Sequence, residues 1–405
     1  MTRVIHTGDT HVGYRQYHSP ERRQDFLDAF ESVVDDAVDD DVDAVVHAGD
    51  LFHDRRPDLP DLLGVLSALR RLDAADVPFL AIVGNHEATR GSQWLDLFSD
   101  LGLATRLDAD PTVVGDTAFY GLDHVPKSRR DDLDYDFTAP PEGVESTALV
   151  GHGLFTPFAH ADWDTEAMLD AATVDFDAVL LGDNHVPDRT TVDGTWVTYC
   201  GSTERASADE RDPRGYNIVE FQTDAVDIRR RSLDTRPFAF VDVELAEGEG
   251  LDRVLDRVRE HDLTDAVAVV SITGDGDPVT PAAIEDAALD AGALLARVTD
   301  HRAVGGDAAA PVTDVDFADP DAAVRERVAE MGLSSLGRRI DETVRDDAVP
   351  DSNVRDRVAS AVGDAVDDLS VDASDDASDD RDDTSDAERD DADAAQDQVS
   401  MEDFL

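Results

Sequence analysis

Short runs of Val, Ile, Leu and Ala alternate with stretches that carry apolar residues at helical spacing, from residue 3 to about residue 221. Such runs are typical of strands buried on both faces, and the helical spacing is typical of helices packed against a sheet. The pattern therefore predicts a layered α/β domain. Its expected strands are 3–7, 43–48, 78–83, 117–122, 147–150, 178–181, 195–199 and 216–221, with helices at 20–38 and 59–75.

A second, smaller unit begins near Pro237. Its expected order is a strand (FAFVDVEL), a helix at 251–259, a strand (AVAVVSIT), a helix at 281–291 and a strand (LLARVT). This α+β unit carries no cluster of ligand-like residues, so we expect it to cap the large domain and to shape access for a substrate.

The C-terminal quarter of the chain changes in composition. Amphipathic patterns predict helices at 320–331, 340–345 and 353–369, whereas the Asp/Ser/Ala stretch that follows cannot bury enough apolar surface to fold alone. We expect five parts: a large domain at 1–235, a capping domain at 236–303, a linker at 304–319, a helical segment at 320–370 and an acidic disordered tail at 371–405.

The charge is strongly negative, at −58. Residues 364 to 397 hold 16 acidic and two basic side chains, so they contribute −14 and the rest of the chain −44. Arginine replaces lysine almost everywhere, and Lys127 is the only lysine. An acidic interaction surface would confine the charge to one patch or tail. Acidity spread over the whole chain instead favours a protein kept soluble in molar salt.

The single cysteine, Cys200, excludes a disulfide within the chain and fits a reducing compartment. No apolar run approaches the about 20 residues that a membrane span needs. We expect a cytoplasmic protein that does not enter a membrane.

Polar clusters follow five of the expected strands. They contain, in chain order, Asp9 and His11; Gly49, Asp50 and His53; Gly84, Asn85, His86 and Glu87; Gly151, His152 and Gly153; and Gly182, Asp183, Asn184 and His185. One such cluster alone is more often a turn or a core histidine, but five in order form a strong signal. Loops at the carboxyl ends of strands converge on one crevice in layered α/β folds. Carboxylate, amide and imidazole groups suit Mn, Fe or Zn, so the sequence predicts a metal site there.

These clusters resemble the signature of the calcineurin-like metallophosphoesterases, which runs D-x-H, G-D, G-N-H-E, H and G-H-x-H, over residues 1 to about 220. Within that superfamily, the segment GDLFHDRRP and the small unit after it are similar to the nuclease subunits of the meiotic recombination eleven and SbcCD type, in a haloarchaeal form. The resemblance implies a layered β-sandwich flanked by helices. It also implies repair of DNA double-strand breaks by phosphodiester hydrolysis, with 3′–5′ exonuclease and single-strand endonuclease activity.

The resemblance further implies two manganese ions per subunit. The ligands of one ion would be Asp9, His11, Asp50 and His185, and those of the other would be Asp50, Asn85 and His152. Asp50 would bridge the two ions. His86 would contact the phosphate and assist the departing oxygen, and His53 would stabilise or position the phosphate. The alternative is that these two histidines only pack against the loops.

The chain departs from the signature at one place, where Asp183 stands for the first histidine of G-H-x-H. Because an aspartate can coordinate Mn, we expect Asp183 to complete the second site. The alternative is a second metal that is weakly bound or lost.

The family resemblance implies two protein partners, and the chain end suggests a third. A homodimer would form through helices at 59–72 and 94–101, whose apolar faces could equally be ordinary core, and the helices after residue 320 would bind the base of a Rad fifty-type coiled-coil ATPase. The chain end resembles the box that docks on the sliding clamp of replication, through Gln398, Met401, Phe404 and Leu405. A nonspecific terminus is the alternative for that last segment.

DNA would be bound at short range, because the Debye length falls to about 3 Å at 1 M salt. The candidate contacts are Arg22 and Arg23, Arg55 and Arg56, Arg129 and Arg130, and Arg229 to Arg231; each group could equally be a solvated partner of nearby aspartates. Two other functions remain open: a small-molecule phosphodiesterase, and a mainly architectural tether of DNA ends with weak catalysis.

Overall fold

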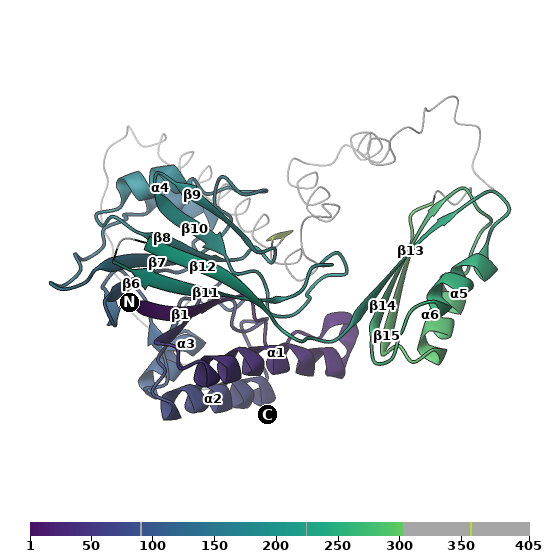
Figure 1. Ribbon diagram of the computed structural model, residues 1–405, viewed down its shortest axis with the longest axis horizontal. Helices are drawn as coiled ribbons and strands as arrows, with labels where there is room; N and C mark the ends of the chain where they lie inside the picture. The colour runs from purple at the N-terminus through teal and green to yellow at the C-terminus, as the bar shows by residue number, and fades with distance from the viewer. Residues whose placement is uncertain (90, 224, 303–356, 359–405) are drawn as a thin grey trace, which may run out of the picture. The chain divides into compact units, whose positions relative to one another are not determined.

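Two six-stranded sheets pack face to face in the computed structural model, which describes residues 1–89, 91–223, 225–302 and 357–358 (Figure 1). The first sheet contains, in spatial order, β12 (Ala225–Ser232), β11 (Gly215–Gln222), β1 (Thr2–Thr7), β2 (Ala44–His47), β3 (Phe79–Ala81) and β4 (Thr105–Arg106). The second contains β5 (Thr112–Val114), β6 (Thr117–Leu122), β7 (Ser146–His152), β8 (Ala178–Gly182), β10 (Thr195–Tyr199) and β9 (Asp188–Val192). Strands β1 to β4 run parallel, as do β6, β7, β8 and β10.

Alternate residues of the central strands enter two different cores, because successive side chains of a strand point to opposite faces. Val4 and Val46 lie between the sheets and pack with Phe119 of the second sheet. Ile5 and Val45 instead face the helices. Strands buried on both faces carry apolar residues at most positions, which explains the nearly continuous apolar runs of the sequence.

Helices cover both outer faces of the sandwich (Figure 1). The first sheet packs against α1 (Pro20–Asp39), α2 (Leu59–Ala74) and α3 (Trp94–Asp100), and the second against α4 (Thr165–Ala171). Short 3-10 segments lie at Gln16–His18 and Lys127–Asp132. The start of α1 is fixed locally, because the Ser19 side chain accepts a hydrogen bond from the backbone N–H of Arg22 and Pro20 occupies the first turn.

The sequence prediction found the interior strands and missed four others, namely β4, β5, β9 and β12. These four are the edge strands of the two sheets. An edge strand in this fold is short or exposes one face, so it lacks the apolar run on which the prediction depends.

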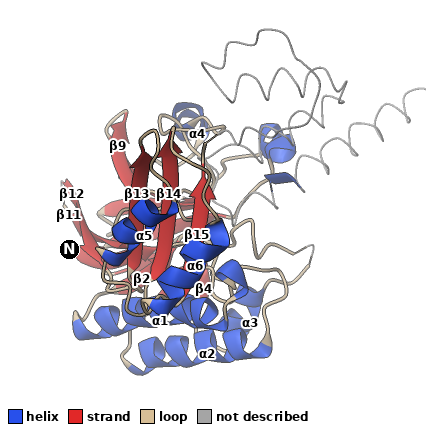
Figure 2. Cartoon of the chain, turned by 90° about the vertical axis from the view of Figure 1, so that its right-hand side faces the viewer, coloured by secondary structure: helices blue, strands red, loops and turns tan. Residues whose placement is uncertain are grey.

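The capping domain is a parallel three-stranded sheet with helices on one face (Figure 2). Its elements are β13 (Phe238–Leu245), α5 (Leu251–Arg259), β14 (Val267–Gly274), α6 (Pro281–Asp290) and β15 (Leu295–Asp300). Val241, Val254, Val270 and Ile284 form part of its separate core. The expected β-α-β-α-β order is confirmed, with each boundary within one residue of its prediction.

The predicted linker, most of the helical segment, the acidic tail and the chain-end box lie outside the described residues. Residues 357 and 358, within the predicted helix 353–369, are helical. The five domain boundaries therefore stay predictions. None of the described helices combines the length and apolar character that crossing a membrane requires.

Candidate metal centre

The five polar clusters meet where the parallel strands of both sheets end. Asp9 and His11 follow β1, Asp50 and His53 follow β2, Asn85 and His86 follow β3, His152 is the last residue of β7, and Asp183 and His185 follow β8. Three of these strands belong to the first sheet and two to the second, so the packing of the sandwich assembles the cluster. Asp9, His11, Asp50 and His152 are completely buried.

Four of the candidate ligands have a left-handed backbone conformation. Their φ angles are 49° for Asp9, 43° for His11, 57° for Asp50 and 86° for Asp183. This region costs a residue with a side chain about 1–3 kcal/mol unless the surroundings enforce it, and such residues gather at functional sites. The backbone strain therefore indicates that these loops have a functional role, which is to place the side chains of the cluster.

Two glycines let the ligand loops approach each other. A Cβ at Gly84 would lie 2.0 Å from Oδ1 of Asp50, and a Cβ at Gly182 would lie 2.2 Å from the carbonyl oxygen of Ala48. No side chain fits at either position, so the loops after β2, β3 and β8 pack backbone against backbone.

The first ligand group combines Asp9, His11 and His185, whose ligand atoms lie within 4.8 Å of one another. The Nε2 atoms of His11 and His185 are 3.0 Å apart. The backbone N–H of Asp183 donates to both carboxylate oxygens of Asp9, at 2.9 and 3.1 Å. Burial raises the pKa of Asp9 to about 6, although the neighbouring His185 and His152 act in the opposite direction.

The second group surrounds His152. Its Nε2 lies 3.0 Å from Oδ1 of Asn85, 3.5 Å from Oδ2 of Asp50 and 3.8 Å from Oδ1 of Asp183. Its other nitrogen, Nδ1, donates to the carbonyl of Ala48 at 2.8 Å. That hydrogen bond turns Nε2 towards the cluster, as in histidines that bind metals.

Asp50 lies between the two groups. Its Oδ1 accepts the backbone N–H of His86 at 2.9 Å, whereas its Oδ2 accepts no hydrogen bond from the described residues. Oδ2 lies 3.5 to 3.9 Å from the Nε2 atoms of His152, His11 and His86. Burial alone would raise the pKa of Asp50, but these histidines hold it well below its ordinary value. A buried carboxylate oxygen without a donor is costly, and a cation at this position would satisfy it. The residues present therefore fit a metal centre.

His86 and His53 lie beside this centre. Nδ1 of His86 donates to the carbonyl of His53 at 2.9 Å, and Tyr14 stacks on the His53 ring with centroids 4.0 Å apart. The ligand atoms of His53, His86 and His11 lie within 4.8 Å of one another. All nine predicted site residues of the phosphoesterase domain thus come together in space.

Three residues near the centre were not assigned by sequence reasoning. Glu87 accepts the backbone N–H groups of Phe52 and Gly84, so it ties two ligand loops together; burial raises its pKa to about 7. Glu210 accepts a hydrogen bond from Nδ1 of His185 at 2.8 Å. The ring of His124 lies 5.9 Å from that of His152. Of these three residues, only Glu87 could have been found from the sequence, because it is the last residue of the G-N-H-E motif.

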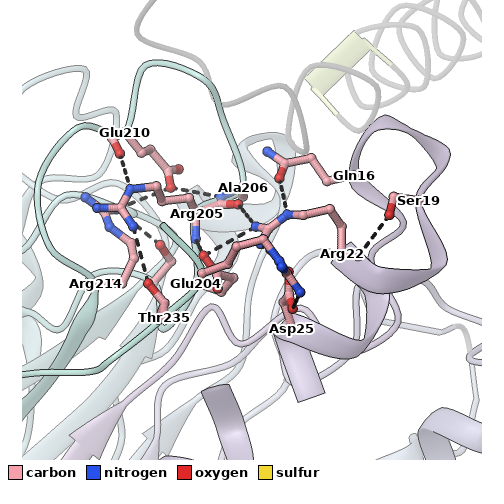
Figure 3. Close-up of polar contacts among 12 residues, drawn as sticks. Gln16, Ser19, Arg22, Asp25, Glu204, Arg205, Ala206, Glu210, Arg214 and Thr235 are labelled. Atoms are coloured by element: carbon pink, nitrogen blue, oxygen red, sulfur yellow. Dashed lines mark hydrogen bonds and ion pairs between the residues drawn. The ribbon is translucent and has the colours of Figure 1, made fainter. Parts of the chain in front are cut away.

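One expected DNA contact is wrong. The Arg22 side chain is completely buried, with Asp25 at 2.6 Å and Glu204 at 3.3 Å, so it cannot reach a phosphate (Figure 3). Arg23 makes a bidentate pair with Asp61 at 2.9 and 2.7 Å. Arg55 and Arg56, in contrast, are exposed two and three residues after His53.

Known proteins with similar sequences agree on one family. The family model for calcineurin-like phosphoesterases matches residues 2–187. "DNA double-strand break repair protein Mre11" of Haloferax volcanii is 70% identical over 368 residues, which cover 91% of this chain and 83% of the relative. The chain belongs to the Mre11 family. The Mre11 of Halobacterium salinarum is 60% identical over 91% of this chain and 95% of its own length. That of Methanosarcina acetivorans is 44% identical over 87% of this chain and 59% of its own length. The protein is thus a DNA double-strand break repair protein with a metallophosphoesterase domain, which is a hydrolase domain.

Proposed function

We propose that this Mre11 protein is a metal-dependent DNA nuclease that cuts phosphodiesters at the cluster around Asp50. The expected activities are 3′–5′ exonuclease and single-strand endonuclease cleavage. The observation that supports this proposal best is the buried Asp50, whose Oδ2 has no hydrogen-bond donor among the described residues and faces three histidine nitrogens.

The proposed ligands form two sets that share Asp50. Asp9, His11, Asp50 and His185 would hold one ion, and Asp50, Asn85, His152 and Asp183 the other. The mixture of carboxylate, amide and imidazole donors suits Mn²⁺, which is our proposed metal. Bound there, two divalent cations supply Lewis acidity and neutralise charge on the phosphate.

His86 is the proposed catalytic residue. Its Nδ1 donates to the His53 carbonyl, and its Nε2 lies 3.9 Å from Oδ2 of Asp50, on the side of the metal centre where we expect the substrate. A histidine can give a hydrogen bond or a proton to a phosphate or departing oxygen near neutral pH. His53, stacked on Tyr14, would position the phosphate.

A cleavage assay tests the function. We expect the protein, with Mn²⁺ in molar KCl, to cut labelled linear DNA, and His86→Gln to lower the rate about 10²-fold while Mn²⁺ binding is kept. His301→Ala is the matched control, because this exposed histidine lies in the capping domain. A small chromogenic phosphodiester is assayed in parallel.

Two outcomes would replace this proposal. Cleavage of the small ester alone would favour a small-molecule phosphodiesterase. Metal binding without cleavage of either substrate, even with the ATPase partner added, would favour a tether of DNA ends.

Asp183 has a test of its own. We expect Asp183→Asn to weaken one of two Mn²⁺ binding events by about tenfold or more, because a charged ligand near His152 is lost. Isothermal titration calorimetry of the metal-free protein measures this change. If wild-type protein binds a single ion and the variant binds it equally well, the alternative of a lost second metal holds.

We propose that the protein forms a homodimer through α2 and α3. Exposed leucines lie on both helices. Leu59 and Leu63 are in α2, Leu97 is in α3, and Leu101 directly follows the last residue of α3. Apolar side chains gathered on a surface mark an interface. We expect Leu63→Glu with Leu97→Glu to convert a dimer into a monomer in light scattering after gel filtration. Leu289→Glu, at a leucine of the capping domain that is 47% exposed, should leave the mass unchanged.

The remaining partners stay predictions. We propose that the helices within 320–370 bind a coiled-coil ATPase and that Gln398, Met401, Phe404 and Leu405 bind a sliding clamp. We also propose that the protein works in a salt-rich cytoplasm, which the buried free Cys200 and the acidic composition support.

A further inference from the structure

The outer nitrogen of His185 is held by a side chain. His185 reaches the centre from the loop after β8, with Nε2 3.0 Å from His11 Nε2, while its Nδ1 donates to Oε1 of Glu210 at 2.8 Å. Both side chains are buried, with 2% and 8% of the residue surface exposed. Because the pair is buried, this hydrogen bond to the carboxylate holds the direction of the ring.

Glu210 is itself held on its second oxygen. Oε2 accepts the backbone N–H of Ala206 at 2.9 Å and the Arg214 guanidinium at 3.3 Å (Figure 3). The same nitrogen of Arg214 also donates to the backbone carbonyl of His185 at 3.1 Å. Arg214 therefore fixes both ends of the pair, the backbone of the histidine and the carboxylate that orients its ring.

The segment that carries Glu210 is anchored independently of the centre. Arg205 donates to the backbone carbonyl of Glu210 at 2.9 Å, and Glu204 pairs with the buried Arg22 of α1 at 3.3 Å (Figure 3). Buried ion pairs contribute little net stability compared with apolar side chains of the same size. We therefore attribute to this network the role of holding Glu210 in a fixed position, and not a large contribution to stability.

His152 offers an internal comparison. Its Nδ1 donates to a backbone carbonyl, that of Ala48, at 2.8 Å. Of the two histidines, one is thus oriented by the main chain and the other by a side chain. A substitution at Glu210 should therefore affect one half of the centre and leave the other half intact.

We propose that Glu210, held by Arg214, is a positioning residue that fixes the ring of His185 and keeps its Nε2 turned towards the metal centre. The proposal rests on the ligand role proposed above for His185. A carboxylate behind a ligating histidine fixes its tautomer and orientation, and losing such a partner typically costs 10–100-fold in metal affinity.

The test measures metal binding and not cleavage. Mn²⁺ is titrated into metal-free wild type, Glu210→Gln and Glu210→Ala, and bound Mn²⁺ is followed by calorimetry and by electron paramagnetic resonance. We expect Glu210→Ala to weaken one of two binding events by about 10–100-fold and to leave the other unchanged. Glu210→Gln keeps an oxygen acceptor of the same reach, so it should recover part of the affinity. If Glu210→Ala does not fold, the isosteric Glu210→Gln carries the comparison.

Asp61→Asn is the matched control. Asp61 is also buried and pairs with an arginine, Arg23, at 2.7 Å, but it lies in α2, outside the network that holds Glu210, and none of its hydrogen bonds or ion pairs among the described residues is with a candidate ligand. Thermal unfolding of the metal-free proteins reports any general loss of stability. An equal loss of Mn²⁺ affinity in Asp61→Asn, or wild-type binding at both sites in the Glu210 variants, would overturn the proposal.

Failure of the nuclease proposal would look different. Wild type that binds two Mn²⁺ ions but cuts no DNA contradicts the proposed activity, and the selective loss in Glu210→Ala would still support the positioning role. Wild type that cuts DNA, with a Glu210→Ala protein that binds Mn²⁺ normally, contradicts the positioning role alone.

Discussion

Replacing Asp50 with asparagine is expected to abolish metal-dependent DNA cleavage, lowering the rate by at least about 10³-fold, which corresponds to about 4 kcal/mol of transition-state stabilisation. Asp50 lies between both groups, because its Oδ2 is 3.5 Å from Nε2 of His152 and 3.9 Å from Nε2 of His11, and this oxygen has no hydrogen-bond donor among the described residues. Asparagine has the same shape but no charge, and its amide can present N–H groups to a cation. Cleavage of labelled DNA and calorimetric titration with Mn²⁺ measure the two effects.

The matched control for this variant is Asp134→Asn. Asp134 is exposed in the segment between the 3-10 turn at Lys127–Asp132 and β7, so the same chemical change should leave cleavage and metal binding unaltered. Asp50→Asn protein that still bound two Mn²⁺ ions at wild-type affinity would show that Asp50 does not bridge them.

A second large effect is expected from adding one methyl group at Gly84. In Gly84→Ala the new Cβ would lie 2.0 Å from Oδ1 and 2.3 Å from the backbone nitrogen of Asp50. The backbone nitrogen cannot rotate away as a flexible side chain would, so the loop after β3 must move. Overpacking of this kind costs about 1–3 kcal/mol, and displacement of Asp50 should remove most of the cleavage activity. Thermal unfolding of the metal-free protein and the DNA assay measure the two losses.

Gly91→Ala provides the control, because a Cβ at that glycine meets nothing within 4 Å. We expect it to keep both its unfolding temperature and its activity. If Gly84→Ala unfolded at the wild-type temperature and cut DNA normally, the contact between the loops after β2 and β3 would be looser than the structure indicates.

The interior strands were predictable because a strand that is buried on both faces appears in the sequence as a run of apolar residues. β2 is Ala-Val-Val-His and is wholly buried, so its run of apolar residues stands out. β12 carries three consecutive arginines, Arg229 to Arg231, and pairs with β11 through backbone hydrogen bonds that any side chain permits. Edge strands of this kind are set by their neighbours in space, which one sequence does not reveal.

The residues of the metal centre also differ in how far the sequence predicts them. Each cluster from Asp9 to His185 follows an apolar strand, so its place at a strand end was predictable. Glu210 was not, because it stands in a loop without a motif and meets His185 only after the chain has folded. Arg22 shows the converse error, since a pair of arginines resembles a phosphate contact until Asp25 and Glu204 enclose one of them.

The origin of the ligands in both sheets has a consequence for the protein as a whole. Asp9, Asp50 and Asn85 follow strands of one sheet, whereas His152 ends a strand of the other sheet and His185 follows one. Ions held by both sets would bind only the assembled sandwich, so binding and folding would be thermodynamically linked, and an ion at 100 times its Kd would add about 2.7 kcal/mol to stability. The bound ions would then also stabilise the packing of the two sheets against each other. A chelator would loosen the sandwich as well as stop the reaction.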